Sequence, residues 1–222
     1  MQGGFPIDLI LFAMVAAFLV LRLRSVLGKR TGYERPPAPQ GVPGGPAARA
    51  EGVVEEIVPA QRGNTRRVIP DVRTPVGQGL SRIATADPNF EPNGFLDGAE
   101  GAFRMIVAAF AQGDRETLRA LLSDDTYAGF EGAITAREQA GESQRTELRP
   151  MHEMVIEGAE LRGTVADVTV RFISDQVNMT TGRDGEIVAG SDAITEVIDI
   201  WTFQRDVGTD DPAWRLTATR SG

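Results

Sequence analysis

The sequence predicts an α+β fold in which N-terminal helices pack on a curved, four-stranded antiparallel sheet. Apolar side chains recur at helical spacing from about residue 77 to residue 140, and at the alternating spacing of strands after residue 142. Helices first and strands afterwards are typical of segregated layers. We expect three parts in this order: a membrane anchor with a basic flank at 1–30, a linker at 31–76 and one α+β domain at 77–222.

The N-terminal part has the composition of a single membrane-spanning helix. Residues 9–21 (LILFAMVAAFLVL) are apolar on every side, and with residues 5–7 they approach the roughly 17 to 25 residues that cross a bilayer. The basic side chains that follow are Arg22, Arg24, Lys29 and Arg30. By the positive-inside rule they predict an inner-membrane protein with its N-terminus outside and its domain in the cytoplasm, and they are the expected contacts with anionic lipid. A cleavable signal peptide would carry its charges before the apolar run.

The next segment is expected to be a disordered linker, because PPAPQGVPGGP cannot bury a core. Its short apolar piece at 53–58 has a brief helix or a docking peptide as alternatives. Residues 1–86 hold 11 Lys or Arg against 6 Asp or Glu, a net charge of +5, whereas residues 87–222 hold 12 against 25, a net charge of −13. An acidic domain repels phosphate backbones, so nucleic acid is not an expected partner.

The domain is organised around a predicted helix at residues 93–112. Side chains at steps of three and four form its apolar stripe, namely Phe95, Ala99, Phe103, Ile106, Val107 and Phe110. Asn93 is the expected N-cap, Gly113 the expected end, and Asp114 the cap of a second helix. Such an apolar helical hairpin needs another surface to cover it.

Two further helices are expected on either side of this hairpin. They cover residues 77–86 and residues 126–140, and Gly141 ends the second of them. The GQG sequence at residue 77 is not a nucleotide-binding fingerprint, because the third glycine and the preceding strand are absent.

Four strands are expected after residue 142. Residues 166–172 alternate cleanly between apolar and polar side chains, as a half-buried strand does. Residues 148–156 contain Pro150, which favours an edge or a bulge. Residues 194–205 and 214–218 complete the set, and the polar loops TTGRDGE and VGTDDP join the strands into an antiparallel sheet.

Large rings are the candidates for an apolar pocket that takes a client or ligand. Most such rings fill a core, but in an open fold a subset would line a groove. The candidate residues are Phe103, Phe110, Tyr127, Phe130, Trp201, Phe203 and Trp214.

The sequence offers few groups for catalysis. Asp199 is in phase with the apolar positions of its strand and could face inward as a base, Tyr127 could donate to an oxyanion, and His152 is the sole histidine. A lone histidine in a strand is more often a hydrogen-bonded structural residue. The chain has no cysteine, and no His or acidic cluster stands at ligand spacing, so neither a metal site nor a cofactor is predicted.

Several short motifs, taken in their order along the chain, resemble the Tim44-like domain family. They are DPNF, FLDGAEGAF, AFAQGDRETLRALL, TYAGF, DIWTFQR and the terminal WRL, within about residues 81–216. The family is named for the scaffold of the mitochondrial inner-membrane translocase, and it includes membrane-tethered bacterial adaptor proteins. The resemblance implies a cone-shaped α+β fold similar to nuclear transport factor two, an apolar cavity between helices and sheet, and scaffolding in place of catalysis.

We therefore expect a membrane-anchored, non-enzymatic adaptor that binds a protein, either an unfolded client or a membrane-bound partner. The alternative is a cone-fold protein that binds a small molecule or lipid, or an isomerase-like enzyme that uses Asp199, Tyr127 or His152. Assembly as a homo-oligomer is compatible with either. The resemblance does not extend to the long chaperone-binding N-terminal region of the mitochondrial scaffold, so it implies nothing about recruitment of an Hsp70 motor.

Overall fold

The computed structural model describes residues 65–222. The predicted membrane-spanning segment 9–21, its basic flank up to Arg30 and the linker as far as residue 64 lie outside the described residues. Within residues 65–222, no helix combines the length and apolar character that crossing a membrane requires.

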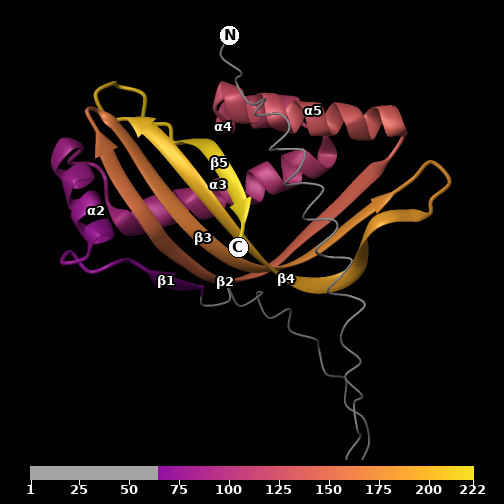
Figure 1. Cartoon of the computed structure of the whole chain (residues 1–222), viewed down its shortest axis with the longest axis horizontal. Helices are drawn as coiled ribbons and strands as arrows, with labels where there is room; N and C mark the ends of the chain where they lie inside the picture. The colour runs from indigo at the N-terminus through magenta and orange to yellow at the C-terminus, as the bar shows by residue number, and fades with distance from the viewer. Residues whose placement is uncertain (1–64) are drawn as a thin grey trace, which may run out of the picture. The chain divides into compact units, whose positions relative to one another are not determined.

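The described residues form four helices and five strands, and in chain order the helices follow the first strand and precede the other four (Figure 1). In chain order the elements are β1 (Arg66–Val68), α2 (Pro75–Ala86), α3 (Pro92–Gln112), α4 (Arg115–Leu121), α5 (Asp124–Ala140), β2 (Ser143–Arg162), β3 (Val165–Thr181), β4 (Ile187–Asp206) and β5 (Arg215–Ser221).

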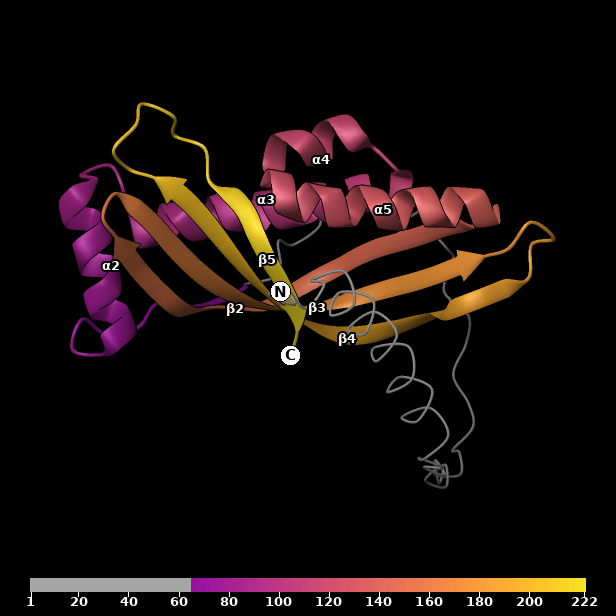
Figure 2. The same ribbon diagram turned by 45° about the horizontal axis from the view of Figure 1, so that its top comes forward.

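All five strands belong to one sheet in the order β1-β2-β3-β4-β5. The strands β2 to β5 pair antiparallel, as expected, and β2, β3 and β4 are longer than the sequence pattern predicts. These long strands bend, and the helices α3, α4 and α5 lie on the concave side (Figure 2). The expected arrangement of helices packed on one face of a curved sheet is therefore confirmed.

The strand count and pairing need a correction, because the sheet has five strands and is mixed. Residues Arg66–Val68, which we expected in the linker, form β1 and pair parallel with Glu153–Val155 of β2. Ion pairs of Arg66 with Glu153 at 2.9 Å and of Arg67 with Asp97 at 2.5 Å hold the strand in place. Three residues are too few to show an alternating pattern, so only this long-range pairing reveals the strand.

The bend of β2 coincides with irregularities in its pairing. The register between β2 and β3 shifts after Leu148, again between Met151 and Glu153, and again after Ile156. Pro150 lies inside the first shift, which is where the sequence favoured a bulge. Because bulges bend a strand and increase its twist, they allow the sheet to wrap around the helices.

The core lies between α3 and the concave face. Phe103 is fully buried and stacks on Phe172 of β3, with ring centroids 4.6 Å apart. Its ring also lies 4.6 Å from the ring of Trp201 on β4. The other buried side chains of α3 are Phe95, Leu96, Ala99, Ile106 and Ala109. The stripe predicted from sequence thus faces the sheet, except that Val107 and Phe110 are only partly buried.

Local capping chemistry fixes the ends of the helices. Gly113 and Gly141 end α3 and α5 in the left-handed conformation, with φ of 71° and 72°, as predicted. Asp114 caps α4 by accepting from the Thr117 amide at 3.1 Å, also as predicted. The N-cap of α3 is Glu91 and not Asn93, because proline occupies the first helical position and the Glu91 carboxylate reaches the Gly94 amide at 2.7 Å.

The helix α2 packs against β2 through glycine. A Cβ atom added at Gly79 would lie 2.0 Å from the carbonyl oxygen of Ala159, so the helix can touch the strand backbone only if this position has no side chain. By contrast, a Cβ added at Gly101 of α3 would meet nothing within 4 Å.

Two alanine substitutions therefore have opposite predicted effects. We expect Gly79→Ala to lower the free energy of unfolding by about 1–3 kcal/mol, since α2 must move away from β2. The matched control Gly101→Ala should raise it by about 0.5–1 kcal/mol, because alanine is the better helix former. Urea denaturation followed by circular dichroism measures both, and equal effects at the two positions would contradict this account of α2 packing.

Candidate functional site

A cavity of about 420 Å³ opens between α3, the C-terminal end of β4 and the loop that leads into β5. Most of its lining is apolar, with polar groups only at the rim. The lining residues are Asn89, Phe90, Glu91, Gly94, Phe95, Gly98, Ala99, Ala102, Met105, Leu121, Phe203, Arg205, Ala213 and Trp214. We call this cavity the α3 groove.

Four aromatic rings form one wall of the α3 groove. Phe95 is central, because its ring lies 4.9 Å from Trp214, 5.8 Å from Phe90 and 6.1 Å from Phe203. Phe90 in turn lies 5.8 Å from Trp214. The tilted and edge-to-face geometries are those that aromatic pairs prefer, so the wall is rigid and apolar.

Small residues on α3 line the groove beside Phe95. Gly94, Gly98 and Ala102 are spaced four apart and lie on one face of the helix. A Cβ added at Gly98 would meet nothing within 4 Å, so packing inside the domain does not require glycine there. Next along this face, Met105 is 50% exposed. Beside the Phe95 ring, the helix therefore presents nearly bare backbone and one flexible thioether to the cavity.

An ion pair between Asp87 and Arg205 holds the rim of the groove together. The Arg205 guanidinium donates to the Asp87 carboxylate at 2.7 Å, and only 15% and 7% of the two side chains are exposed. Asp87 also accepts from the Asn89 amide at 3.0 Å, and Arg205 donates to the Asp211 carbonyl at 3.0 Å. The pair thus joins the turn before α3 to the end of β4 and to the β4–β5 loop.

The structure separates the seven aromatic residues that sequence analysis proposed for a pocket. Phe203 and Trp214 line the α3 groove. Phe103 and Trp201 belong to the buried core. The remaining three lie elsewhere, since Phe110 and Phe130 pair with each other at 5.1 Å between α3 and α5, and Tyr127 is buried beneath the Arg119 guanidinium.

The groove also includes residues that sequence analysis did not select. Phe90, Phe95 and Met105 resembled ordinary core or surface positions, and Gly94 and Gly98 resembled neutral positions in the helix. The unexplained glycines at helical spacing were the available signal, because a glycine inside a helix costs about 0.5–1 kcal/mol relative to alanine.

A second polar group lies on the concave face, farther along β4. Asp199 is paired across the sheet with Phe172 and accepts a hydrogen bond from the Gln176 amide nitrogen at 3.0 Å. Gln176 also donates to Ser174 at 3.1 Å and accepts from Asn178 at 3.0 Å. Burial raises the pKa of Asp199 to about 6, and the hydrogen bond from Gln176 opposes this shift.

The three residues of the catalytic alternative do not meet in one site. His152 lies on the convex face, where its Nε2 is 3.1 Å from Asp175 Oδ2, whereas Asp199 faces the concave side. Tyr127 is on α5, and neither it nor Asp199 lines the α3 groove. A base, a donor and a shared substrate cavity are therefore not assembled from these side chains.

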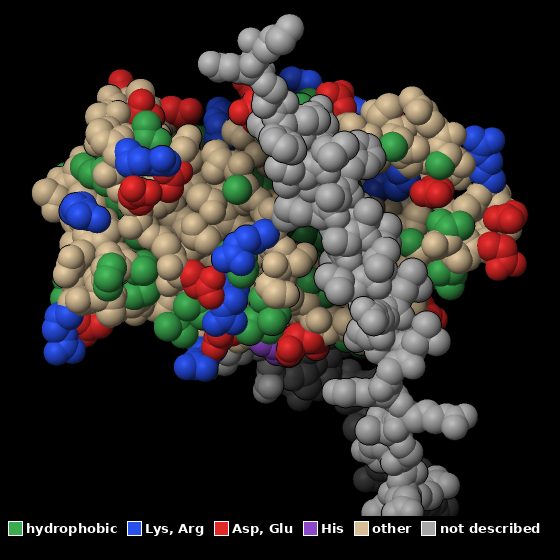
Figure 3. All heavy atoms as spheres, viewed as in Figure 1, with side chains coloured by type: hydrophobic (Ala, Val, Ile, Leu, Met, Phe, Trp, Pro, Cys, Tyr) green, Lys and Arg blue, Asp and Glu red, His purple; other side chains and the backbone are tan. Residues whose placement is uncertain are grey.

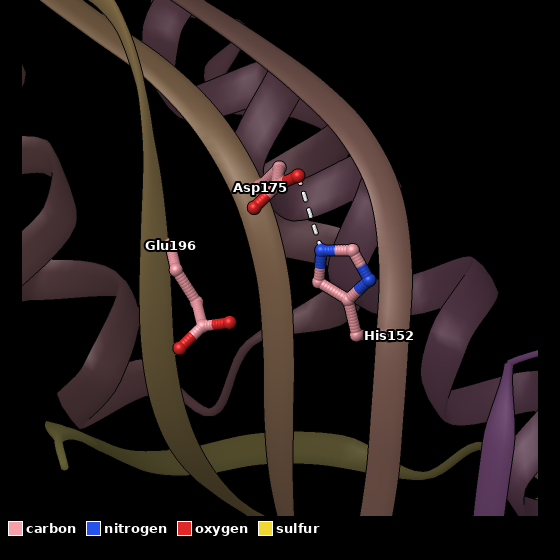
Figure 4. A group of neighbouring side chains, drawn as sticks. All are labelled: His152, Asp175 and Glu196. Atoms are coloured by element: carbon pink, nitrogen blue, oxygen red, sulfur yellow. Dashed lines mark ion pairs between the residues drawn. The ribbon is translucent and has the colours of Figure 1, made fainter. Parts of the chain in front are cut away.

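The convex face also holds a group of possible metal ligands that linear spacing could not reveal. His152, Asp175 and Glu196 come from β2, β3 and β4, and one ligand atom of each lies within 4.8 Å of the others (Figure 4). Basic and acidic side chains also lie side by side on the described surface (Figure 3). On the convex face, Arg171 forms ion pairs with Glu153 and Glu157.

One curated relative is subunit TIM44-1 of the mitochondrial import inner membrane translocase from Arabidopsis thaliana. It is 25% identical over 141 residues, which cover 60% of this chain and 30% of the relative. The chain thus matches less than a third of that protein's length.

Solved structures with low sequence identity to this chain are similar to a little more than half of it. The intermembrane space region of the chloroplast protein ARC6 is 10% identical, with a TM-score of 0.41, and the similarity covers 56% of this chain and 94% of that one. An NTF2-like protein from Cytophaga hutchinsonii is 15% identical, with a TM-score of 0.33 and the same two coverages.

The family comparison bears on the motifs that surround the α3 groove. DPNF supplies Asp87 and Phe90, DIWTFQR supplies Phe203 and Arg205, and WRL supplies Trp214, so the sequence resemblance and the groove involve the same residues. The model of the Tim44-like domain matches residues 76–221. The chain therefore belongs to the Tim44-like domain family.

Proposed function

We propose that this protein is a non-enzymatic adaptor that holds an apolar segment of a partner protein in the α3 groove. The observation that carries the proposal is the groove itself, whose lining combines aromatic rings with nearly bare helix backbone. Such a surface lets a partner chain approach α3 closely and bury apolar area without a polar group that must be matched. Membership of a family named for a translocase scaffold supports a role with protein partners in translocation.

The occupant is expected to be a segment of a client or of a membrane-bound partner. The cavity of about 420 Å³ has room for a few side chains, so it fits a short peptide better than a folded surface. Asn89, Glu91 and Arg205 at the rim can receive the backbone polar groups of that peptide. A leucine at position 98 would point into this space, whereas a leucine at Gly132 of α5, also open in the structure, would not.

Blocking the groove provides the main test. A photoreactive amino acid at Met105 of the full-length chain should crosslink to a recurring protein in intact membranes, identified by mass spectrometry. Gly98→Leu should reduce that crosslink about tenfold, since it removes one good apolar contact with the occupant. Gly132→Leu is the matched control and should leave the yield unchanged, with both variants as stable as the parent. Equal yields from all three chains would contradict a partner in the groove.

Membrane attachment is the second part of the proposal. The apolar run at 9–21 would anchor the chain, residues 31–64 would give the domain reach, and the basic side chains that follow the run would contact anionic lipid. Those side chains are Arg22, Arg24, Lys29 and Arg30.

The orientation of the anchor can be measured by fusion. We expect a reporter enzyme that is active only outside the cytoplasm to be silent when fused after Arg30, because the positive charges keep that side in the cytoplasm. The control is the same reporter fused before residue 5, which should be active. A strong signal from the fusion after Arg30 would reverse the orientation.

A second candidate function rests on the desolvated carboxylate of Asp199. A carboxyl group with its pKa raised to about 6 could orient a small molecule or lipid, or act as a base. An ordered ligand that copurifies with its polar end at Asp199 would favour this candidate. Against it, His152 lies on the opposite face and Asp199 does not line the groove.

The environment of Asp199 predicts a pH-dependent stability. Its folded pKa of about 6 exceeds the ordinary value of 3.8, so its destabilising effect is absent below about pH 4, grows between pH 4 and 6, and is constant above. Asp199→Asn cannot ionise, so it avoids this loss. We expect its free energy of unfolding, taken relative to that of the parent, to be about 1–3 kcal/mol higher at pH 7.5 than at pH 4. Urea titrations across this range test the claim, and a difference that does not change with pH would refute the raised pKa.

A further inference from the structure

Three side chains of different strands converge on the convex face of the sheet. His152 of β2 and Asp175 of β3 are 3.1 Å apart, measured from Nε2 to Oδ2. Glu196 of β4 is paired directly across from Asp175, and one ligand atom from each residue lies within 4.8 Å of the other two. Figure 4 shows the three side chains approaching one another from neighbouring strands.

A bulge in β2 directs His152 toward this point. Met151 and Met154 are buried on the concave side, so the two residues between them, His152 and Glu153, both face outward. The register shift between Met151 and Glu153 is the cause. Without the extra residue, strict alternation would send one of the two side chains to the other face.

The two carboxylates of the cluster face each other without a basic residue between them. Like charges directly opposite on neighbouring strands are destabilising. On the same face Glu153 has Arg171 at 3.1 Å and Glu157 has Arg171 at 2.7 Å. Among residues 65–222, however, Asp175 has only His152 as an ion-pair partner, and Glu196 has none. A positive charge between Asp175 and Glu196 would remove the repulsion.

We propose that His152, Asp175 and Glu196 bind a divalent transition-metal ion of the Zn²⁺ class. One imidazole nitrogen and two carboxylate oxygens are a donor set typical of such ions, whereas Ca²⁺ and Mg²⁺ favour oxygen alone. Bonds of about 2.0–2.2 Å would place the ligand atoms roughly 3.3 Å apart. The separation of His152 Nε2 and Asp175 Oδ2 already matches that distance. The side chain of Glu196 is exposed and can rotate, which would bring its carboxylate oxygen to the same distance from the other two ligand atoms. Water completes the coordination on this open face.

The ion would link three strands in a part of the sheet where strand pairing is incomplete. β5 pairs with β4 only from Asp199 to Gln204, so the stretch of β4 around Glu196 has no neighbour on its outer side among the described residues. On the other side, the pairing of β2 with β3 is interrupted between Leu148 and Glu153. A metal bridge across β2, β3 and β4 therefore stabilises the outer half of the curved sheet.

The composition of the chain makes the test selective. The full sequence contains one histidine and no cysteine, so any zinc site with a nitrogen ligand from an imidazole must use His152. We would titrate ZnCl₂ into the full-length chain in detergent, after removal of the affinity tag and treatment with chelator. With [¹⁵N]histidine labelling, the Nε2 resonance of His152 should shift on binding. At a hundredfold excess over Kd, the melting temperature should rise by about 5–10 °C.

Single substitutions separate this site from adventitious binding. His152→Gln and Glu196→Gln should each abolish the thermal shift, and Glu160→Gln, which removes an exposed carboxylate elsewhere on β2, should keep it. In chelator, Glu196→Gln should melt no lower than the parent, because it relieves the repulsion with Asp175. An unchanged Nε2 resonance in the parent, or the same thermal shift in His152→Gln or Glu196→Gln, would overturn the proposal.

Discussion

The contact between α3 and the bend of the sheet is the constraint on which the rest of the domain depends. Phe103 projects from the middle of α3 and lies against Phe172 and Trp201, both at 4.6 Å. A curved sheet has a concave face that water would otherwise fill, and a long apolar helix is the simplest element that can cover it. Phe103 fixes the helix at the centre, and toward its N-terminus Phe95 packs on Phe203 of β4, where the groove opens beside the helix.

Polar contacts between residues that are far apart in the sequence fix the rim of the groove. Asp87 and Arg205 are 118 residues apart, yet their ion pair at 2.7 Å joins the start of α3 to the end of β4. Removing one partner of such a pair leaves a buried charge and costs about 3–5 kcal/mol. The aromatic wall depends on this closure, since Phe90 follows Asp87 in the same turn and Phe203 precedes Arg205 on the same strand. The family motifs thus share one site although they are distant in sequence.

The features that could be predicted from sequence were the helix caps and the two layers, because neighbouring residues determine them. The caps at Gly113, Asp114 and Gly141 follow from backbone geometry within a few residues, and the helical and alternating patterns identified the two layers. The strand β1, the bulges of β2 and the resulting neighbours of His152 depend on pairing between distant segments, which no local pattern encodes. For the same reason Phe203 and Trp214 could be chosen as pocket residues, whereas Phe103 and Trp201 could not be distinguished from them before the packing was known.

The inner face of β4 limits what can occupy the groove. From its C-terminal end inward it presents Phe203, then Trp201 and then Asp199, so it changes from apolar to polar within five residues. The rings of Phe103 and Trp201 close the core between the two regions. An apolar segment that continued past them would have to displace this core and separate the hydrogen-bonded polar groups of Asp199 and Gln176, which costs more than the added contact would supply. An occupant of the groove would therefore enter and leave on the Trp214 side, next to the rim that Asp87 and Arg205 hold in place.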